Sequence, residues 1–318
     1  MLKKLSLLVP MFNEEEVIVS FFDEVIPILE ELPLLWEIIC VNDGSKDKTL
    51  DLLIEWHTKD TRIKVVNLSR NFGKERALTA ALDFATGDAM IPIDVDLQDP
   101  PEVIPQLVSL WEEGFDVVNA VRGNRDSDTL MKRLTARWFY RVINSVSDVK
   151  ISPDTGDFRL LSKRACDVLR NMRESRRFMK GLFSWVGYNT TSIYYERRPR
   201  FAGTTKWNYW KLFNLAIEGI TSFSTAPLKL STYIGSIFAL FSVCYAIYLI
   251  FDTLIYGNDV KGYPSIMTAI LFVGGIQLVF IGIIGEYIGK INDEVKGRPI
   301  YIVESVRGLS KLDLVPNI

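Results

Sequence analysis

Two carboxylates separated by one residue form the strongest chemical signal in the sequence. Asp94 and Asp96 belong to the stretch Asp94-Val95-Asp96-Leu97-Gln98-Asp99-Pro100, which directly follows a short apolar segment. Side chains at positions i and i+2 of an extended segment point the same way. Two hard oxygen ligands beside an open coordination sphere suit Mg²⁺ or Mn²⁺ shared with a diphosphate. A solvated acidic turn is the alternative, but Asp43, at the end of a neighbouring predicted strand, favours the metal site.

The elements that must position these carboxylates alternate between short apolar strands and amphipathic helices. This alternation predicts an α/β fold with a mostly parallel sheet covered on both faces. The predicted strands are 5–9, 36–41, 63–68, 89–93 and 116–121. The predicted helices are one capped by Asn13, with Glu14, Glu15 and Glu16 in its first turn, and those over 49–60, 74–86 and 101–113. Ligands of such sheets bind beyond the carboxyl ends of the strands, where polar residues 10–15, 42–45, 69–74 and 94–99 occur.

The overall charge narrows the kind of partner. The 318 residues carry a formal net charge of -2, which argues against general nucleic-acid binding.

The cysteines and the single histidine give no sign of a metal or redox site. Cys40, Cys166 and Cys244 lie far apart and form neither a metal-ligand spacing nor a disulfide framework. The single histidine, His57, is expected to be structural. No G-x-G-x-x-G follows a predicted strand and no Walker-type loop occurs, which disfavours the common dinucleotide and P-loop sites.

Two long apolar runs near the C-terminus predict a membrane hairpin. Residues 230–251 and 266–288 are almost uninterruptedly apolar, and about 20 residues suffice to cross a hydrocarbon core of about 30 Å. A buried soluble hairpin is the alternative. Basic residues flank the two runs on their outer sides, so the protein is expected to be multi-pass in the inner (plasma) membrane with both termini cytoplasmic. Glycines in the second run permit close helix packing, and homo-oligomerisation through this surface is a hypothesis.

Several short motifs follow one another along the chain. They are Val9-Pro10-Met11-Phe12-Asn13-Glu14-Glu15, Val41-Asn42-Asp43-Gly44-Ser45, Ser69-Arg70-Asn71-Phe72-Gly73-Lys74, the Asp94 to Pro100 stretch, Asp154-Thr155-Gly156-Asp157-Phe158-Arg159 and Arg200-Phe201-Ala202-Gly203-Thr204-Thr205-Lys206. In this order they resemble the inverting glycosyltransferases of family 2, which have the Rossmann-like GT-A fold. More narrowly, the sequence resembles the polyprenyl-phosphate glycosyltransferases, which include dolichol-phosphate mannose synthases and bactoprenol glucosyltransferases. The two C-terminal runs match the bacterial branch.

The resemblance implies a metal-dependent hexosyltransferase that inverts the anomeric centre. The implied donor is a nucleotide sugar, UDP-glucose by likeness to the bactoprenol branch, and the implied acceptor is a polyprenyl phosphate such as undecaprenyl phosphate. GDP-mannose stays open as the donor. A processive polysaccharide synthase is disfavoured because its Q-x-x-R-W motif is absent, with Leu134 where glutamine would precede Arg137-Trp138. Complete acidic and basic motifs disfavour a membrane scaffold with a decayed transferase domain.

The same resemblance implies which residues bind the donor. Four residues would form the nucleotide pocket: Pro10, Asn13, Glu15 and Asp43. Asp43 would accept a hydrogen bond from the imino N–H of the base, while turn formation and helix capping are the alternative roles in this group. Lys74 would reach the donor or its phosphates, or it is a solvated lysine at a helix start. Asp94 and Asp96, with Gln98 nearby, would hold Mg²⁺ or Mn²⁺ on the diphosphate, and Asp96 counts among the catalytic residues for this reason.

The acceptor side must bring a lipid phosphate close to an anionic nucleotide. One divalent ion cannot neutralise both groups, so cationic side chains are needed opposite the metal. The candidates are Arg122, Arg125, Arg200 and Lys206. Attraction of a juxtamembrane basic stretch to anionic lipid head groups is the alternative, and both can hold. Asp157 is the candidate catalytic carboxylate that orients the acceptor or takes a residual proton, unless it is a structural turn residue.

Three parts of the chain are expected to differ in their surroundings. Residues 1–228 are expected to form the cytoplasmic catalytic domain, residues 229–290 two transmembrane helices, and residues 291–318 a cytoplasmic tail. Residues 129–147 combine tryptophan with a basic stripe, and residues 207–224 place tryptophans directly before the first apolar run. Both segments are expected to lie as helices in the membrane interface, with packing on the catalytic core as the alternative.

Overall fold

A computed structural model describes residues 2–123, 155–174, 177, 179–198, 226–256 and 262–309. The first part of the chain alternates strands and helices in the predicted order. Its elements are β1 (Lys4–Met11), α1 (Ile18–Glu31), β2 (Leu35–Asn42), α2 (Thr49–Lys59), β3 (Ile63–Leu68), α3 (Lys74–Phe84), β4 (Ala89–Pro92), a 3₁₀ turn (Pro101–Val103), α4 (Ile104–Glu112) and β5 (Val117–Arg122). After residue 154 follow β6 (Thr155–Ser162), α6 (Lys163–Asn171), α7 (Met179–Trp185) and β7 (Thr190–Tyr195).

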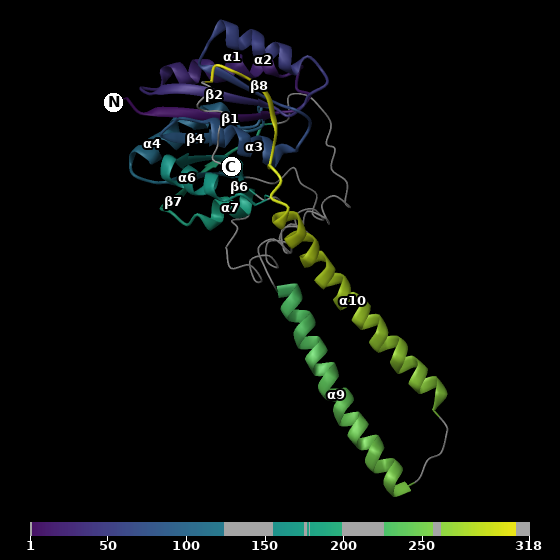
Figure 1. The fold of residues 1–318 in the computed structure, drawn as a ribbon. Coiled ribbons are helices and arrows are strands. Elements are labelled where there is room, and N and C mark those ends of the chain that lie inside the picture. The colour runs from purple at the N-terminus through teal and green to yellow at the C-terminus, as the bar shows by residue number, and fades with distance from the viewer. Residues whose placement is uncertain are drawn as a thin grey trace.

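The strands form one mixed sheet in the order β7-β5-β6-β4-β1-β2-β3-β8, where β8 is Val303–Arg307. Six strands pair parallel within the groups β4-β1-β2-β3 and β5-β7, whereas β6 runs antiparallel to both β4 and β5. Neighbouring residues of each strand face opposite sides, so Leu7 and Leu8 of β1 enter different cores. Helices α1, α2 and α4 cover one face and α3, α6 and α7 the other, which confirms the predicted α/β architecture (Figure 1).

The C-terminal segment adds a strand that the sequence analysis does not predict. Residues 291–318 are expected there to be a tail outside the catalytic domain. Instead, Val303–Arg307 form β8, which pairs antiparallel with the free edge of β3. The pairing has a physical reason, because an uncovered edge strand exposes a row of unpaired backbone donors and acceptors. Part of the expected tail therefore belongs to the sheet.

Two long helices separate β7 from β8 and extend away from the sheet (Figure 1). α9 (Ala226–Tyr256) and α10 (Tyr263–Val295) contain the two apolar runs and contact each other, with 5.7 Å between the ring centroids of Phe238 and Phe272. Among the described residues, Phe272–Val295 is long and apolar enough to cross a membrane by length and composition. The predicted interfacial helices, 129–147 and 207–224, lie outside the described residues.

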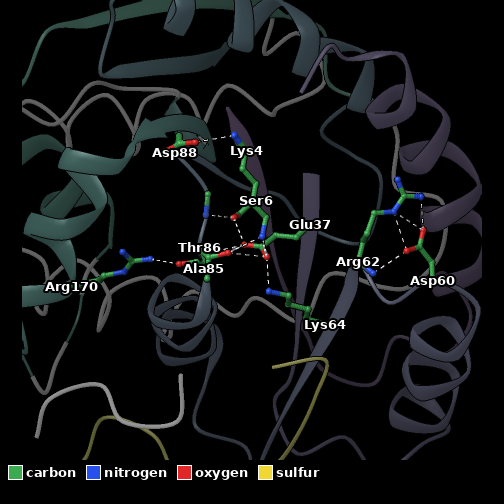
Figure 2. Close-up of polar contacts among 11 residues, drawn as sticks. Lys4, Ser6, Glu37, Asp60, Arg62, Lys64, Ala85, Thr86, Asp88 and Arg170 are labelled. Carbon is green, nitrogen blue, oxygen red and sulfur yellow. Dashed lines mark hydrogen bonds and ion pairs between the residues drawn. The ribbon is translucent and has the colours of Figure 1, made fainter. Parts of the chain in front are cut away.

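A buried carboxylate ties the first three strands and the loop before β4 together, near the amino-terminal ends of these strands (Figure 2). Glu37 on β2 is 1% exposed and accepts contacts from Lys4 Nζ at 2.6 Å and Lys64 Nζ at 2.7 Å. Ser6 Oγ and the backbone N–H of Thr86 donate to its other oxygen at 2.6 and 2.8 Å. Burial raises the pKa of Glu37, but the two lysines and the other donors outweigh it and lower the pKa from 4.5 to about 2. The side chain is thus a charged cross-link at the end of the sheet away from the polar loops.

Candidate active site

The central feature of the site is an ammonium held between two carboxylates. Lys74 begins α3, and its Nζ lies 2.7 Å from Asp94 Oδ1 and 2.9 Å from Asp157 Oδ2. Asp94 follows β4 and Asp157 lies on the adjacent strand β6, so three elements bring these residues together. All three were singled out from the sequence, but their mutual contact was not predicted. The Lys74 ammonium therefore lies between the Asp94 and Asp157 carboxylates at the rim of the sheet.

The surroundings shift the protonation of this group. Burial raises the pKa of Asp94 above the ordinary aspartate value; Lys74 opposes the rise, and the neighbouring Asp157 adds to it. Burial alone lowers the pKa of the Lys74 ammonium, but the two carboxylates outweigh it and hold that pKa above the ordinary lysine value. Lys74 is accordingly a positive charge that compensates the two carboxylates.

The segment after β4 differs from the extended conformation assumed in the sequence analysis. The strand ends at Pro92, the chain turns at Val95 and Asp96, and Leu97 has a φ of 54°. A positive φ is strained for leucine, and such strain clusters at functional sites. Asp94 and Asp96 are nevertheless half-buried while Val95 and Leu97 are buried, so both carboxylate-bearing residues remain partly accessible. Asp96 Oδ1 accepts a hydrogen bond from Gln98 N at 3.3 Å, which closes the turn.

The oxygen ligands near the rim fit a shared metal ion better than a protein-built metal cage. Within the described ranges, no group of three or more His, Cys, Asp or Glu side chains could hold an ion together. Mg²⁺ is commonly bound by one or two carboxylates, with substrate phosphates and water completing its coordination. Asp94 and Asp96 supply that number of carboxylates within three residues of the turn. The residues present therefore fit a divalent ion that arrives with, or is completed by, a diphosphate.

Asp43 holds the loop that leads to Lys74. Its Oδ1 accepts from the backbone N–H of Phe72 at 2.7 Å and its Oδ2 from that of Gly73 at 2.9 Å. Burial raises the pKa of Asp43, and these two hydrogen bonds oppose the rise. An ionised carboxylate has about four acceptor positions, so two remain for a ligand. Beside it, Gly44 has a φ of 65°, and a Cβ there would lie 2.4 Å from the backbone carbon of Arg70.

The loops after β1 and β2 are bonded to each other, and this corrects the expected role of Asn13. Helix α1 begins at Ile18 without a side-chain cap, so neither Asn13 nor the three following glutamates belong to its first turn. Asn13 instead has a φ of 55°, and its Oδ1 accepts from Lys46 N at 2.8 Å. Glu15 Oε2 accepts from Lys48 N at 2.9 Å. Pro10 lies in β1 opposite Val41, directly before this pair of loops.

A second cluster lies on the β5 side of the site. Arg122 ends β5, and one terminal nitrogen of its guanidinium lies 3.4 Å from the position of a Cβ on Gly156. Burial lowers the pKa of Arg122, but Tyr195 and Asp99 outweigh it and raise the pKa above the ordinary arginine value. Tyr195 in turn donates a hydrogen bond from its hydroxyl to Asp99. The sequence analysis predicts Arg122 but misses Asp99 and Tyr195, whose proximity depends on β7 pairing with β5.

Arg159 is a buried cation that the sequence analysis also misses. It is 3% exposed, its guanidinium donates to the Gly156 carbonyl at 2.7 Å, and it lies 4.2 Å from the centroid of the Phe183 ring. Burial lowers its pKa to about 10, although Asp157 opposes the change. Its position within the motif that contains Asp157 was the available signal. The remaining predicted acceptor residues, Arg125, Arg200 and Lys206, lie outside the described residues.

Comparison with known proteins identifies the class. The family model described as glycosyl transferase family 2 matches residues 6–170, and the model of the GtrB C-terminal hairpin matches residues 226–291. The chain belongs to glycosyl transferase family 2. It is therefore a glycosyltransferase, as the motifs predict.

Relatives extend the similarity over almost the whole chain. An uncharacterized glycosyltransferase, sll0501, of Synechocystis sp. is 53% identical over 98% of both chains. The bactoprenol glucosyl transferase of Shigella phage SfII is 51% identical over 95% of this chain and 97% of its own. A prophage bactoprenol glucosyl transferase homolog of Escherichia coli K12 is 50% identical over 96% of this chain and 99% of its own. The similarity therefore includes both the site loops and the helical hairpin.

Proposed function

We propose that the protein transfers glucose, with inversion, from UDP-glucose to a polyprenyl phosphate of the undecaprenyl type at the cytoplasmic face of the membrane. The observation that supports the proposal is the group formed by Asp94, Lys74 and Asp157, which gathers two carboxylates and an ammonium at the rim of the sheet. Transfer from a sugar diphosphate to an acceptor phosphate needs charged groups of both signs. Similarity to bactoprenol glucosyl transferases over nearly the full length supports the choice of glucose and of the lipid acceptor.

Two adjoining regions bind different parts of the donor: one binds the nucleoside and the other the diphosphate. The bonded loops that contain Pro10, Asn13, Glu15 and Asp43 hold the nucleoside, with the free acceptor positions of Asp43 directed to the imino N–H of the base. Lys74 binds the phosphates with its ammonium. Asp94 and Asp96, with Gln98, would hold Mg²⁺ or Mn²⁺, and such an ion supplies Lewis-acid neutralisation of the diphosphate. Negative charge on the nucleotide is thus opposed from the side of α3 and from the turn after β4.

The transfer itself is a single displacement. A phosphate oxygen of the polyprenyl phosphate attacks the anomeric carbon as the bond from that carbon to the UDP oxygen breaks, and the bonding electron pair leaves with UDP. Because the second pKa of a phosphate monoester is about 6, the acceptor is largely ionised at neutral pH and a strong base is unnecessary. Asp157 orients the acceptor or takes a residual proton. Arg122, together with Arg125, Arg200 and Lys206, offsets the acceptor charge.

The helical hairpin brings the lipid acceptor to the site. We assign both α9 and α10 as transmembrane helices, with both termini cytoplasmic, on the basis of their length, apolar sequence and flanking charges. Residues 1–228 and the segment that includes β8 then form the cytoplasmic catalytic part, and residues 129–147 and 207–224 lie in the interface. Homo-oligomerisation through the glycines of α10 belongs to the same proposal.

A transfer assay on purified full-length protein tests the function. The protein is incubated with undecaprenyl phosphate, Mg²⁺ or Mn²⁺ and radiolabelled UDP-glucose, GDP-mannose or other nucleotide sugars, and label is counted in the organic phase. We expect label from UDP-glucose, and a loss of about 100-fold or more in the Asp94→Ala, Asp96→Ala double variant. The exposed pair Asp51→Ala, Glu55→Ala on α2 serves as the charge-matched control. Label from GDP-mannose alone would refute the donor, and full activity of the double variant would refute the site.

A further inference from the structure

The segment after α10 returns to the sheet and contacts the region that leads into the site. Just before β8, the carbonyl oxygen of Ile302 accepts a hydrogen bond from the backbone N–H of Ser69 at 3.0 Å. Ser69 begins the loop that ends at Lys74. On β8 itself, Glu304 Oε2 accepts a hydrogen bond from Asn67 Nδ2 at 2.9 Å, across 237 residues of sequence. Side-chain and backbone contacts therefore connect the end of the hairpin to the end of β3.

A relay of side-chain amides continues from Glu304 into the sheet. Asn67 on β3 and Asn42 on β2 are register partners and are 6% and 1% exposed. Asn42 Nδ2 donates to Asn67 Oδ1 at 2.7 Å, and Asn42 Oδ1 accepts from the backbone N–H of Ser45 at 3.3 Å. Buried amides are normally hydrogen-bonded, because an unmade bond leaves a desolvated polar group. The relay satisfies both asparagines and ends on the loop after β2.

The groups at the two ends of the relay, the Glu304 carboxylate and the backbone N–H of Ser45, determine how the amides of Asn67 and Asn42 are oriented. A carboxylate accepts hydrogen bonds and a backbone N–H donates them. Glu304 therefore requires the Nδ2 of Asn67, which leaves the Oδ1 of Asn67 facing Asn42. Asn42 must then present Nδ2 to Asn67 and Oδ1 to Ser45. Loss of the acceptor oxygen at position 304 removes the group that sets this direction and leaves Asn67 Nδ2 without its acceptor.

Ser45 is the point where the relay meets the bonded loops of the site. Its Oγ accepts a hydrogen bond from Asn13 N at 2.9 Å, while Asn13 Oδ1 accepts from Lys46 N. Asp43 lies between Asn42 and Ser45 in the same short turn. The relay thus ends among residues to which the proposed function assigns the nucleoside.

We propose that Glu304 is a positioning residue for nucleotide binding, which acts through Asn67 and Asn42 to hold residues 42–46 in the conformation that receives the nucleoside. The identity of the ligand rests on the proposed function, whereas the relay does not. Because Glu304 closely follows α10, the same arrangement attaches the helical hairpin to the nucleotide pocket.

The test compares full-length Glu304→Ala and Glu304→Gln with Arg307→Ala, a control on the same strand whose guanidinium bonds the adjacent Val306 carbonyl. We expect Glu304→Ala to raise the KM for UDP-glucose and the Kd for UDP about five- to tenfold, as for the net contribution of one ordinary hydrogen bond. The kcat and the KM for polyprenyl phosphate stay at their wild-type values. Glu304→Gln retains wild-type donor affinity because its side-chain oxygen still accepts.

Amide hydrogen exchange gives a readout that needs no ligand. Peptides covering residues 42–48 should exchange faster in Glu304→Ala than in the wild type, and unchanged in Glu304→Gln and Arg307→Ala. Wild-type exchange at 42–48 together with unchanged UDP affinity in Glu304→Ala overturns the inference. If instead the wild type binds no uridine nucleotide while Glu304→Ala shows faster exchange, the proposed donor is wrong and the relay stands.

Discussion

Replacement of Glu37 by glutamine removes the charged cross-link near the amino-terminal ends of the first three strands. The fall of its pKa from 4.5 to about 2 is a free-energy difference, and at 1.36 kcal/mol per unit it corresponds to about 3 kcal/mol of stability at neutral pH. Solvent screens these contacts little, because Glu37 is 1% exposed. Glutamine keeps the shape and one acceptor oxygen but leaves Lys4 and Lys64 without their common counter-ion. We therefore expect a loss of about 3 kcal/mol in Glu37→Gln.

Thermal unfolding in detergent, followed by tryptophan fluorescence, measures this loss. For a domain of this size, about 3 kcal/mol lowers Tm by roughly 6–12 °C. Glu30→Gln is the matched control, because Glu30 pairs with Arg62 at the surface and its side chain is 51% exposed. Such exposed pairs contribute about 0.2–1 kcal/mol. A Tm for Glu37→Gln as high as that of Glu30→Gln would refute the argument.

The dependence on pH gives a second check on Glu37. Its pKa is lower in the folded protein than in the unfolded chain, so its contribution is fully present above about pH 4.5 and is lost as the pH falls through about 2. The difference in Tm between the wild type and Glu37→Gln should therefore stay constant from pH 8 to pH 5 and shrink in more acidic buffer. A difference that shrinks already between pH 8 and pH 6 would point to another titrating group.

Two further predictions concern the site. Asp157→Asn should bind UDP as the wild type does but form no glycolipid, because the acceptor loses its orienting carboxylate; calorimetry and the transfer assay measure the two steps, and normal turnover would remove Asp157 from the catalytic residues. Gly44→Ala should weaken UDP binding by more than about tenfold, since its Cβ would lie 2.4 Å from the backbone of Arg70. Gly114→Ala, also at a positive φ but with no atom within 4 Å, controls for backbone strain, so equal UDP affinities in these two variants would contradict the clash.

Local patterns sufficed to predict much of the fold. The strands β1 to β5 and the helices between them were expected within a few residues, because apolar periodicity and Gly or Asn breaks are properties of short segments. The polar ends of these strands predicted correctly that Asp43, Lys74 and Asp94 belong to neighbouring loops. The order of elements alone was enough for this, since parallel strands bring their carboxyl ends to one edge.

What the sequence analysis missed depends on contacts between distant segments. β8 is a short strand whose pairing with β3 joins residues far apart in the chain, and no periodicity predicts such a partner. Asn13 has the sequence signature of a helix cap, but its Oδ1 instead accepts a hydrogen bond from Lys46 N in the loop after β2. The Lys74 position between two carboxylates likewise requires β6 to lie beside β4. Each of these features depends on tertiary contacts, and at Asn13 those contacts override a local preference.

The pairing of β8 with β3 has a consequence for how the molecule is made. Asn67 and Glu304 are 237 residues apart, and at about 5–20 residues per second a ribosome needs roughly 10–50 s to extend the nascent chain from one to the other. During that interval the hairpin leaves the ribosome, while one side of β3 has no strand beside it. An open strand edge is a template for aggregation. Biogenesis must therefore protect this edge until the last part of the polypeptide closes it.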